Sequence, residues 1–391
     1  MTSPALTDRP SRIELGRALL DSGTLQPDWL ATFHAVDRAQ FLPDTVWAYD
    51  MITKTSIGVE KSADPRAWYA AADSDVPLVT QWDDGQHEGL APGRTATSSS
   101  SMPSVVYQLL ADLALDQGME VLDVGTGTGE TAAALCHRTG SDHVTTLEVD
   151  IAVSRHAEQR LQATGFCPTV VVGDGTAGHQ QRQALDRILA TFGLHHIPGK
   201  WVDQTRRGGL LVAPWGTRYS HANAVARLRV DGNRASGHFT RPVEFMQSRS
   251  QRRAPIDPAR YVPPGGVGGA DVSTTTVTED EFGSGRYGAL PFVLGLRVPG
   301  CVQAAADKRG DARPVWFYSL TDRSWACVNF RDGRAQSRVW QSGQRRLWDE
   351  VEHVYRWWVA QGSPGVDRFG LTVTPDGQQA WLDDPRNAWP V

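Results

Sequence analysis

A glycine-rich turn that directly follows a short apolar segment constrains the fold of this chain more than any other feature. Residues 121–129 read Val-Leu-Asp-Val-Gly-Thr-Gly-Thr-Gly, and the apolar residues around Asp123 are typical of a buried parallel strand. Residues 130–138 have helical composition, so the segment predicts a strand, a tight turn and a helix. Glycine lets the backbone approach a ligand where a Cβ atom would collide. We therefore expect a ligand at this turn.

The spacing of the glycines indicates which ligand is bound. A dinucleotide-binding turn would carry a further glycine at position 130, where this chain has Glu130. A Gly-x-Gly-x-Gly turn after an acidic strand is similar to the turn of S-adenosyl-L-methionine-dependent methyltransferases. That cofactor has no phosphate, so a glycine serving a pyrophosphate is not needed. The residues expected to bind S-adenosyl-L-methionine at this turn are Asp123, Gly125, Thr126, Gly127 and Gly129.

Strand and helix patterns alternate around this turn. Strands are expected at residues 119–124, 143–149, 169–173, 186–191 and 209–214, and helices at 103–115, 130–138, 151–164 and 199–206. Strands separated by helices at this spacing predict a parallel, doubly wound α/β sheet. Right-handed crossovers place each loop that follows a strand at one edge of that sheet.

Two more loops at this edge carry acidic residues. Glu148 lies 23 residues after Gly125, close to the ~20 expected for an acid that binds both ribose hydroxyls, and Asp150 is the reserve. Asp174, at the end of the third strand, is expected to accept a hydrogen bond from the adenine amino group. Each acid alone is equally typical of a turn residue or a helix cap. Their joint position at strand ends favours a cofactor site, to which Val149, Gly173 and Gly175 are also assigned.

Composition excludes several classes of protein. The chain has 391 residues, 40% of them hydrophobic and 21% charged, which is typical of a globular protein with two or three domains. The net charge of −5 and the lack of a basic tract argue against a nucleic-acid partner. No apolar run approaches the ~20 residues that span a membrane, and no signal peptide is evident. The four cysteines lack a Cys-x-x-Cys pair and indicate reduced thiols in a cytoplasmic protein. His195-His196 has no accompanying ligand pattern, so no metal is expected.

The flanking regions differ from the core. Helices are expected at residues 13–20 and 27–38, and residues 42–98 look irregular, with one candidate strand at 77–81. Beyond residue 216 the pattern predicts strands at 224–230 and 238–245, a linker at 263–269 and one clear helix at 344–361. Fourteen tryptophans are present, eight of them between Trp316 and Trp389. They fit either a peptide-binding surface or a core that includes Trp325, Trp340 and Trp358.

These patterns predict three parts. Residues 1–100 form an N-terminal helical and irregular extension that ends in a loop approaching the substrate. Residues 101–225 form the methyltransferase core. Residues 226–391 form a mixed, strand-rich accessory domain, expected to recognise a peptide.

The chain resembles the protein-L-isoaspartate O-methyltransferase family over roughly residues 10–220. The resemblance is carried by residues 33–43, 121–129, 173–175, 186–190 and 208–216. It implies that a serine in a Ser-x-Pro motif ahead of the first sheet strand contacts the substrate carboxylate. Ser101-Met102-Pro103 matches that motif, so Ser101 is the expected catalytic residue and Ser100 and Ser104 are expected to assist substrate binding. On the residues alone, a serine run before a helix more often forms a capped loop.

Two departures suggest a narrower branch of that family. The chain continues about 170 residues past the core, and the loop between residues 44 and 98 is long. Together with residues 74–81 and 369–376, these features resemble methyltransferases that accompany ATP-grasp peptide maturases. The resemblance implies that a ribosomal precursor peptide, already cross-linked by the ATP-grasp ligase, is esterified at one aspartate and closes to an aspartimide. A general isoaspartyl repair enzyme and a non-catalytic peptide-binding module remain the alternatives.

Overall fold

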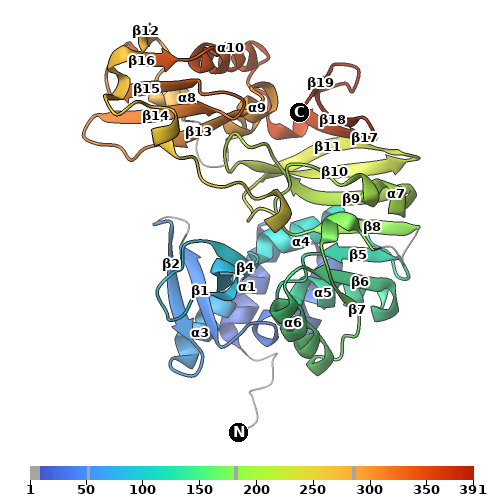
Figure 1. Cartoon of the computed structure of the whole chain (residues 1–391). Helices are drawn as coiled ribbons and strands as arrows, with labels where there is room; N and C mark the ends of the chain where they lie inside the picture. The colour runs from blue at the N-terminus through green and yellow to red at the C-terminus, as the bar shows by residue number, and fades with distance from the viewer. Residues whose placement is uncertain (1–8, 51–52, 180–183, 284–287) are drawn as a thin grey trace. The chain divides into compact units, whose positions relative to one another are not determined.

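The computed structural model describes residues 9–50, 53–179, 184–283 and 288–391 (Figure 1). The chain divides into two compact units. The first contains the chain up to Thr191 together with residues 198–212 and 229–233. The second contains residues 192–197, 213–228 and 234–391. The division of the sequence into three parts at residues 100 and 225 stays a prediction.

The first unit opens with two helices, α1 (Pro10–Asp21) and α2 (Leu30–Ala35). The helix expected at 13–20 is confirmed within α1. The helix expected at 27–38 is shorter, because Val36 adopts an extended conformation with φ −108° and ψ 92°. Asp37 then caps a short 3₁₀ turn, Arg38–Gln40, by accepting a hydrogen bond from the backbone N–H of Ala39.

The described residues between 42 and 98 include strands and a helix, so the prediction of an irregular stretch is wrong. They form an antiparallel sheet in the order β2-β1-β3-β4, with a helix α3. Its elements are β1 (Thr45–Asp50), β2 (Thr55–Glu60), α3 (Pro65–Ala72), β3 (Leu78–Trp82) and β4 (Ala96–Ser100). The sequence signal is weak because the apolar cluster that packs the helix on the sheet is small and includes Val46, Trp68 and Leu78. Only the strand expected at 77–81 is confirmed.

The parallel sheet of the first unit confirms the predicted α/β fold. Its strands lie in the order β9-β8-β5-β6-β7. They are β5 (Val121–Val124), β6 (Val144–Glu148), β7 (Thr169–Val172), β8 (Leu185–Ala190) and β9 (Thr205–Trp215). The helices around them are α4 (Pro103–Asp112), α5 (Glu130–Thr139), α6 (Ile151–Ala163) and α7 (Gly199–Gln204). The strand order reverses at β5, between β6 and β8, and such switch points are where open α/β sheets bind ligands.

The second unit contains strands in two groups. The first group lies in the order β19-β18-β17-β11-β10, and the second forms an antiparallel sheet in the order β12-β16-β15-β14-β13. The first group comprises β10 (Asn223–Asp231), β11 (Arg234–Val243), β17 (Phe369–Thr374), β18 (Gly377–Leu382) and β19 (Ala388–Pro390). The antiparallel sheet comprises β12 (Asp271–Thr275), β13 (Cys301–Ala305), β14 (Ala312–Ser319), β15 (Trp325–Arg331) and β16 (Ser337–Ser342). β9 and β10 are divided between the two units.

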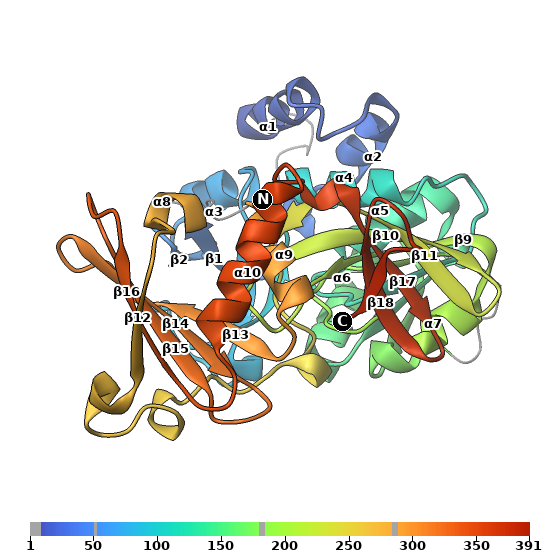
Figure 2. The ribbon, with the colours of Figure 1, turned by 90° about the horizontal axis from the view of Figure 1, so that it is seen from above.

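Three helices accompany the antiparallel sheet: α8 (Glu279–Phe282), α9 (Ala289–Arg297) and α10 (Leu347–Ala360). α10 confirms the helix expected at 344–361 and packs along the sheet (Figure 2). The expectation of one clear helix is wrong, because α9 was missed. α9 carries Pro291 in its first turn and buries residues all round its axis, so no amphipathic period marks it.

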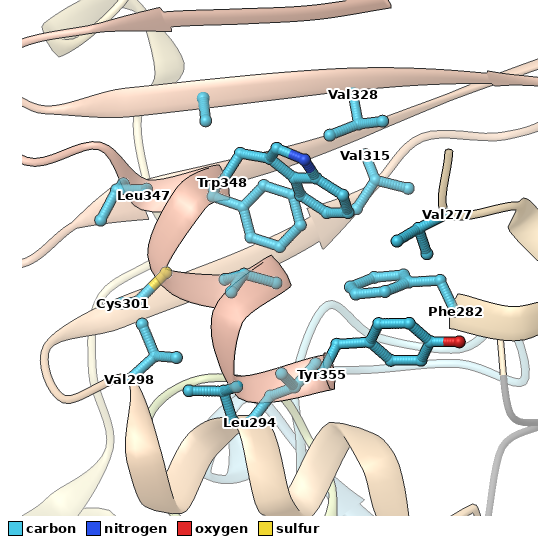
Figure 3. Close-up of a cluster of buried hydrophobic side chains, with 14 of the residues drawn as sticks. Val277, Phe282, Leu294, Val298, Cys301, Val315, Val328, Leu347, Trp348 and Tyr355 are labelled. Atoms are coloured by element: carbon cyan, nitrogen blue, oxygen red, sulfur yellow. The ribbon is translucent and has the colours of Figure 1, made fainter. Parts of the chain in front are cut away.

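An aromatic cluster fills the space between α10 and the sheet (Figure 3). Trp348 is 1% exposed and packs against Phe282 and other rings. Trp325 is buried on the other side of the sheet strands, in a cluster with Tyr318 and Cys327. Trp340 and Trp358 are partly buried against these clusters. Of the tryptophans named as candidate core residues, Trp325 therefore packs as core, whereas Trp340 and Trp358 are only partly buried.

Candidate cofactor and substrate site

The glycine turn forms as the sequence predicts. β5 ends at Val124, and Gly125, Gly127 and Gly129 have φ of +91°, +54° and +93°, which glycine adopts without strain. The N–H groups of Gly125 and Thr126 donate to the Leu147 carbonyl at 2.8 and 3.1 Å. This fixes the turn to the end of β6, and α5 starts directly after it.

The two acids at the end of β6 have different surroundings. Glu148 is 8% exposed, and its Oε2 accepts a hydrogen bond from Gly127 N at 3.0 Å while Oε1 accepts from Asp150 N at 3.1 Å. Asp150 caps α6 by accepting from the N–H groups of Ala152 and Val153. Glu148 therefore lies at the glycine turn, with lone pairs left for a ligand, whereas Asp150 is engaged in capping the N-terminus of α6.

Asp123 is fully buried beneath this turn. Its Oδ2 accepts from Thr146 Oγ1 at 2.7 Å, and Thr146 Oγ1 lies 2.7 Å from Thr126 Oγ1. Its Oδ1 is buried without a hydrogen-bond partner among the described residues. Burial, reinforced by the Glu148 charge and opposed by the Thr146 hydrogen bond, raises the pKa of Asp123 to about 7. The orphaned oxygen and the neighbouring carboxylate make this edge electronegative, which suits a cationic ligand.

The third loop joins the same edge. Gly173 N donates to the Glu148 carbonyl at 2.9 Å, and a Cβ on Gly175 would lie 2.1 Å from Val124 Cγ1, so the loop packs tightly on β5. Asp174 is exposed and accepts from Thr176 N at 3.0 Å, which makes it a turn cap with a free face. Val149 is 48% exposed. The loops thus gather at one edge, and their contacts with a cofactor stay a prediction.

The serine run lies against the glycine turn. Ser98 and Ser100 are 7% and 3% exposed on β4, and Thr80 Oγ1 donates to Ser98 Oγ at 3.2 Å. A Cβ on Gly127 would lie 3.5 Å from the Ser99 carbonyl oxygen. β4 therefore brings the predicted substrate serines to the turn predicted to bind the cofactor.

The three candidate substrate serines differ in their partners. Ser100 Oγ accepts from Arg38 Nε at 2.7 Å and donates to Glu130 Oε2 at 2.8 Å. Ser101 is half-buried, and its hydroxyl has no hydrogen-bond partner among the residues that the structure describes. The backbone N–H of Ser104, in the first turn of α4, donates to Asp75 Oδ1 at 2.8 Å. The hydroxyls of Ser101 and Ser104 are thus the two that no described residue engages, and the role of each stays a prediction.

Arg38 and Glu130 were missed as site residues. Burial lowers the pKa of the Arg38 guanidinium, opposed by the charge of Glu130. Burial raises the pKa of Glu130, opposed by the Arg38 charge and the Ser100 hydrogen bond. Arg38 stood inside the family-like segment 33–43, and Glu130 stood where a dinucleotide turn has glycine. The charge of these two residues, at those two positions, was the sequence signal that could have identified them as site residues.

The histidine, cysteine and membrane expectations from the sequence can also be compared with the structure. His195 Nδ1 donates to the Gly216 carbonyl at 2.8 Å, and burial lowers the pKa of this histidine. Within the described ranges, no three His, Cys, Asp or Glu side chains gather as metal ligands. The four cysteines are free. None of the helices in the described part of the chain is long and apolar enough to cross a membrane.

Comparisons with known proteins place this geometry in a family. A family model described as protein-L-isoaspartate(D-aspartate) O-methyltransferase matches residues 14–250, more than half of the chain. The protein-L-isoaspartate O-methyltransferase of Hyperthermus butylicus is 34% identical over 157 residues, which cover 37% of this chain and 64% of that protein. Protein-L-isoaspartate O-methyltransferase 2 of a Polaromonas species is 35% identical, covering 39% and 72%. The Azorhizobium caulinodans enzyme is 36% identical, covering 41% and 73%.

A solved structure extends the similarity in fold. The structure of a protein-L-isoaspartate O-methyltransferase superposes with a TM-score of 0.52 at 17% identity and covers 95% of this chain and 100% of its own. At that identity it shows the fold alone, which is the class I methyltransferase fold with an additional strand-rich C-terminal region. The family match itself rests on the sequence of residues 14–250. The chain therefore belongs to the protein-L-isoaspartate(D-aspartate) O-methyltransferase family, a family of S-adenosylmethionine-dependent carboxyl O-methyltransferases.

Proposed function

We propose that this chain transfers the methyl group of S-adenosyl-L-methionine to the side-chain carboxylate of an aspartyl or isoaspartyl residue in a peptide or protein. The observation that carries the proposal is the half-buried hydroxyl of Ser101, which has no partner among the described residues and directly follows β4, the strand that lies against the glycine turn. A hydroxyl in that position is a donor for a carboxylate. Family membership supplies the reaction class.

The residues at the sheet edge fit this cofactor. S-adenosyl-L-methionine is a cation at its sulfur and at its amino group, and the Glu148 carboxylate and the unpaired Asp123 Oδ1 present acceptors at this edge. The glycine turn would hold the amino-acid part of the cofactor, Glu148 the ribose hydroxyls and Asp174 the adenine amino group. When bound, the cofactor supplies an electrophilic methyl group whose leaving group is a neutral thioether.

The chain's own task is chiefly alignment. A substrate carboxylate with a pKa near ~4 is already ionised at neutral pH, so no strong base is required. Ser101 would donate to that carboxylate and orient one oxygen for in-line attack, which accelerates a reaction between two bound groups. The backbone N–H of Ser104 is already bound by Asp75, so the hydroxyls of Ser101 and Ser104 are the donors that remain near the start of α4. The hydroxyl of Ser104 would assist.

Methyl transfer to a synthetic isoaspartyl peptide by Ser101→Ala tests the proposal. Loss of a hydrogen bond to a charged group is expected to lower kcat/KM roughly 10- to 150-fold, with the affinity for S-adenosylhomocysteine unchanged in calorimetry. Ser99→Ala is the neighbouring control, because it removes a hydroxyl from β4 that is not assigned to substrate binding. Wild-type kcat/KM in Ser101→Ala would contradict the proposal. Absence of cofactor binding by the wild type would favour the non-catalytic binding module.

A narrower substrate is proposed as a second candidate: an aspartate of a ribosomal precursor peptide already cross-linked by an ATP-grasp ligase. Its support is the resemblance of residues 74–81 and 369–376 to that branch, together with the position of Ser74 and Val76, whose carbonyls share Arg38 with the serine run. The length of the C-terminal region adds no support, because the structure of a protein-L-isoaspartate O-methyltransferase covers 95% of this chain. In the methyl ester, methanol is a better leaving group than hydroxide, so the next backbone nitrogen can displace it and close an aspartimide.

A competition experiment separates the two substrates. The enzyme is incubated with labelled S-adenosyl-L-methionine, the cross-linked precursor, the same precursor before cross-linking, and an isoaspartyl peptide. Preferential labelling of the cross-linked precursor, followed by release of methanol, supports the narrower substrate. Labelling of the isoaspartyl peptide alone rejects it and supports general repair.

A further inference from the structure

A buried group of three polar side chains adjoins the proposed substrate serine. We propose that Arg38, Ser100 and Glu130, here named the positioning cluster, hold the backbone of Ser101 so that its hydroxyl meets the substrate carboxylate. The inference rests on the proposed function and adds three positioning residues to it. None of the three is proposed to touch the substrate or the cofactor.

Arg38 is the hub of the cluster. Its side chain is 2% exposed, and its Nε donates to Ser100 Oγ. Its Nη2 donates to the carbonyls of Val76, Ser100 and Ser101, each at 3.0 Å, and its Nη1 donates to the Ser74 carbonyl at 3.1 Å. One guanidinium therefore ties two separate chain segments together and fixes the carbonyl of Ser101 itself. A lysine ammonium has three donors and no planar fork, so it cannot replace these contacts.

Glu130 connects this hub to the glycine turn. It is the first residue of α5, directly after Gly129, and its side chain is 14% exposed. Glu130 Oε2 accepts from Ser100 Oγ and lies 3.8 Å from Arg38 Nε. A carboxylate in the first turn of a helix is also favoured by the helix dipole. The cluster thus spans from the turn proposed to hold the cofactor to the strand proposed to hold the substrate.

The pattern of hydrogen bonds favours positioning over simple packing. Ser100 uses its hydroxyl as both donor and acceptor within the cluster, whereas the hydroxyl of the next residue, Ser101, has no partner among the described residues. The backbone is therefore held tightly on both sides of a side chain that is left free. A buried ion pair adds little stability compared with an apolar core of the same volume. Its use at this place is explained by a demand for fixed geometry.

The first test is a double-mutant cycle measured with the full chain and an isoaspartyl peptide. Ser100→Ala is expected to raise KM for the peptide about tenfold, with kcat changed less and with the affinity for S-adenosylhomocysteine within about twofold of wild type. Because Ser100 acts through Ser101, the double variant Ser100→Ala/Ser101→Ala is expected to be no worse than Ser101→Ala. Multiplication of the two single effects would overturn the proposal. Ser99→Ala is again the control.

The second test compares two changes at Glu130. Glu130→Gln keeps an oxygen that accepts from Ser100 Oγ, so KM is expected to rise no more than about threefold. Glu130→Ala removes the acceptor and is expected to match Ser100→Ala. Equal KM values for wild type and Glu130→Ala would overturn the proposal. The milder glutamine variant keeps the test decisive if the alanine variant fails to fold.

A third measurement does not depend on turnover. Amide hydrogen exchange at residues 100–102 is followed in the chain bound to S-adenosylhomocysteine. Ser100→Ala is expected to speed exchange there about tenfold, whereas Ser99→Ala leaves it unchanged. Unchanged exchange in Ser100→Ala overturns the positioning cluster. A wild type that methylates no peptide, combined with faster exchange in Ser100→Ala, overturns the proposed function and leaves the cluster's hold on Ser101 standing.

Discussion

Two buried clusters, one in each unit, are built from opposite kinds of side chain. The positioning cluster in the first unit buries a guanidinium, a hydroxyl and a carboxylate. The aromatic cluster in the second unit buries Trp348 among Phe282, Phe317 and Phe330, at ring-centroid distances of 5.5, 5.6 and 6.1 Å (Figure 3). The first joins short segments far apart in sequence, and the second joins a helix to a sheet.

The two clusters therefore differ in role: the aromatic cluster contributes stability, and the positioning cluster fixes geometry. Buried rings contribute hydrophobic free energy and favourable ring contacts, so an aromatic cluster stabilises its unit. A whole buried ion pair contributes little net stability compared with apolar residues, although removing one partner leaves an unpaired charge, and the pair accepts few alternative arrangements. We therefore expect changes in the first unit's polar groups to alter binding, kinetics or pH dependence. Changes in the second unit's rings should alter unfolding.

The largest effect is expected for Trp348→Ala. The side chain is 1% exposed and also donates from Nε1 to Glu352 at 2.8 Å, so truncation leaves a cavity and removes one of the hydrogen bonds that Glu352 accepts. The free energy of unfolding is expected to fall by about 3–5 kcal/mol in urea titrations. For Trp340→Ala, which truncates a partly buried ring, the free energy of unfolding should fall by less. A weakened affinity for S-adenosylhomocysteine in Trp348→Ala would break the comparison, because it would tie the aromatic cluster to the site.

The next effect is a pH dependence in the first unit. Burial raises the pKa of Asp123 to about 7 in the folded chain, against about 3.9 in an unfolded chain. Between those values the folded state keeps a proton that the unfolded state has released, so this group's contribution to stability falls as pH rises from about 4 to about 7. The expected slope is at most about 1.4 kcal/mol per pH unit.

Asp123→Asn is expected to remove that slope. Asparagine keeps an oxygen that accepts from Thr146 but does not ionise. Urea unfolding of the apo chain at several pH values gives the difference between wild type and variant, which should change across this window and be flat above it. A difference that is constant from pH 4 to pH 8 would show that Asp123 titrates normally despite its burial.

The parallel sheet and the glycine turn could be predicted from the sequence, because the alternation of strand and helix patterns and the spacing of the glycines are visible in short segments of the chain. Gly127 and Gly129 need positive φ, and that demand is written in the residue type. The sheet of residues 45–100 was missed because its few buried side chains, such as Val46 and Leu78, are spread over a polar stretch. Helix α9 was missed because it is apolar on every side.

The candidate site was predictable only in part. Ser101 and Glu148 stand at positions that a motif or a strand end marks. Arg38 contacts Ser100 across 62 residues, and no local pattern reports a partner at such a distance. The same limit applies to Asp150, whose residue type fits ribose binding and helix capping equally, and which caps α6 in the structure.

That distinction between two acids gives a third prediction. Glu148→Gln is expected to weaken binding of S-adenosylhomocysteine about tenfold, because it removes a charged acceptor that also holds Gly127 N. Asp150→Asn is the matched control: asparagine caps helices as well as aspartate does, so affinity should stay within about twofold. Calorimetric titration measures both. A larger effect at Asp150 would reassign the ribose contact to it.

The smallest effect on the free energy of unfolding is expected at Arg297, a charged residue of the second unit that packs on aromatic rings. The guanidinium carbon of Arg297 lies 4.2 Å from the ring centroid of Trp357 and 4.6 Å from that of Trp389. Burial lowers the pKa of Arg297, so the rings offset a desolvation penalty. Arg297→Met keeps an unbranched stem on the rings and removes both the attraction and the penalty. The loss of unfolding free energy should therefore be only about 0.5–1 kcal/mol.

Arg38 and Arg297 are both partly or fully buried guanidinium groups, but they are held by different interactions. Arg38 is held by directional hydrogen bonds that set a backbone conformation, whereas Arg297 is held by ring faces that tolerate sliding. Arg38→Met should therefore raise the peptide KM, while Arg297→Met should change only the urea midpoint. A rise in KM for Arg297→Met comparable with that for Arg38→Met would mean that buried charge in both units serves the reaction, and the assignment of stability to one unit and geometry to the other would fail.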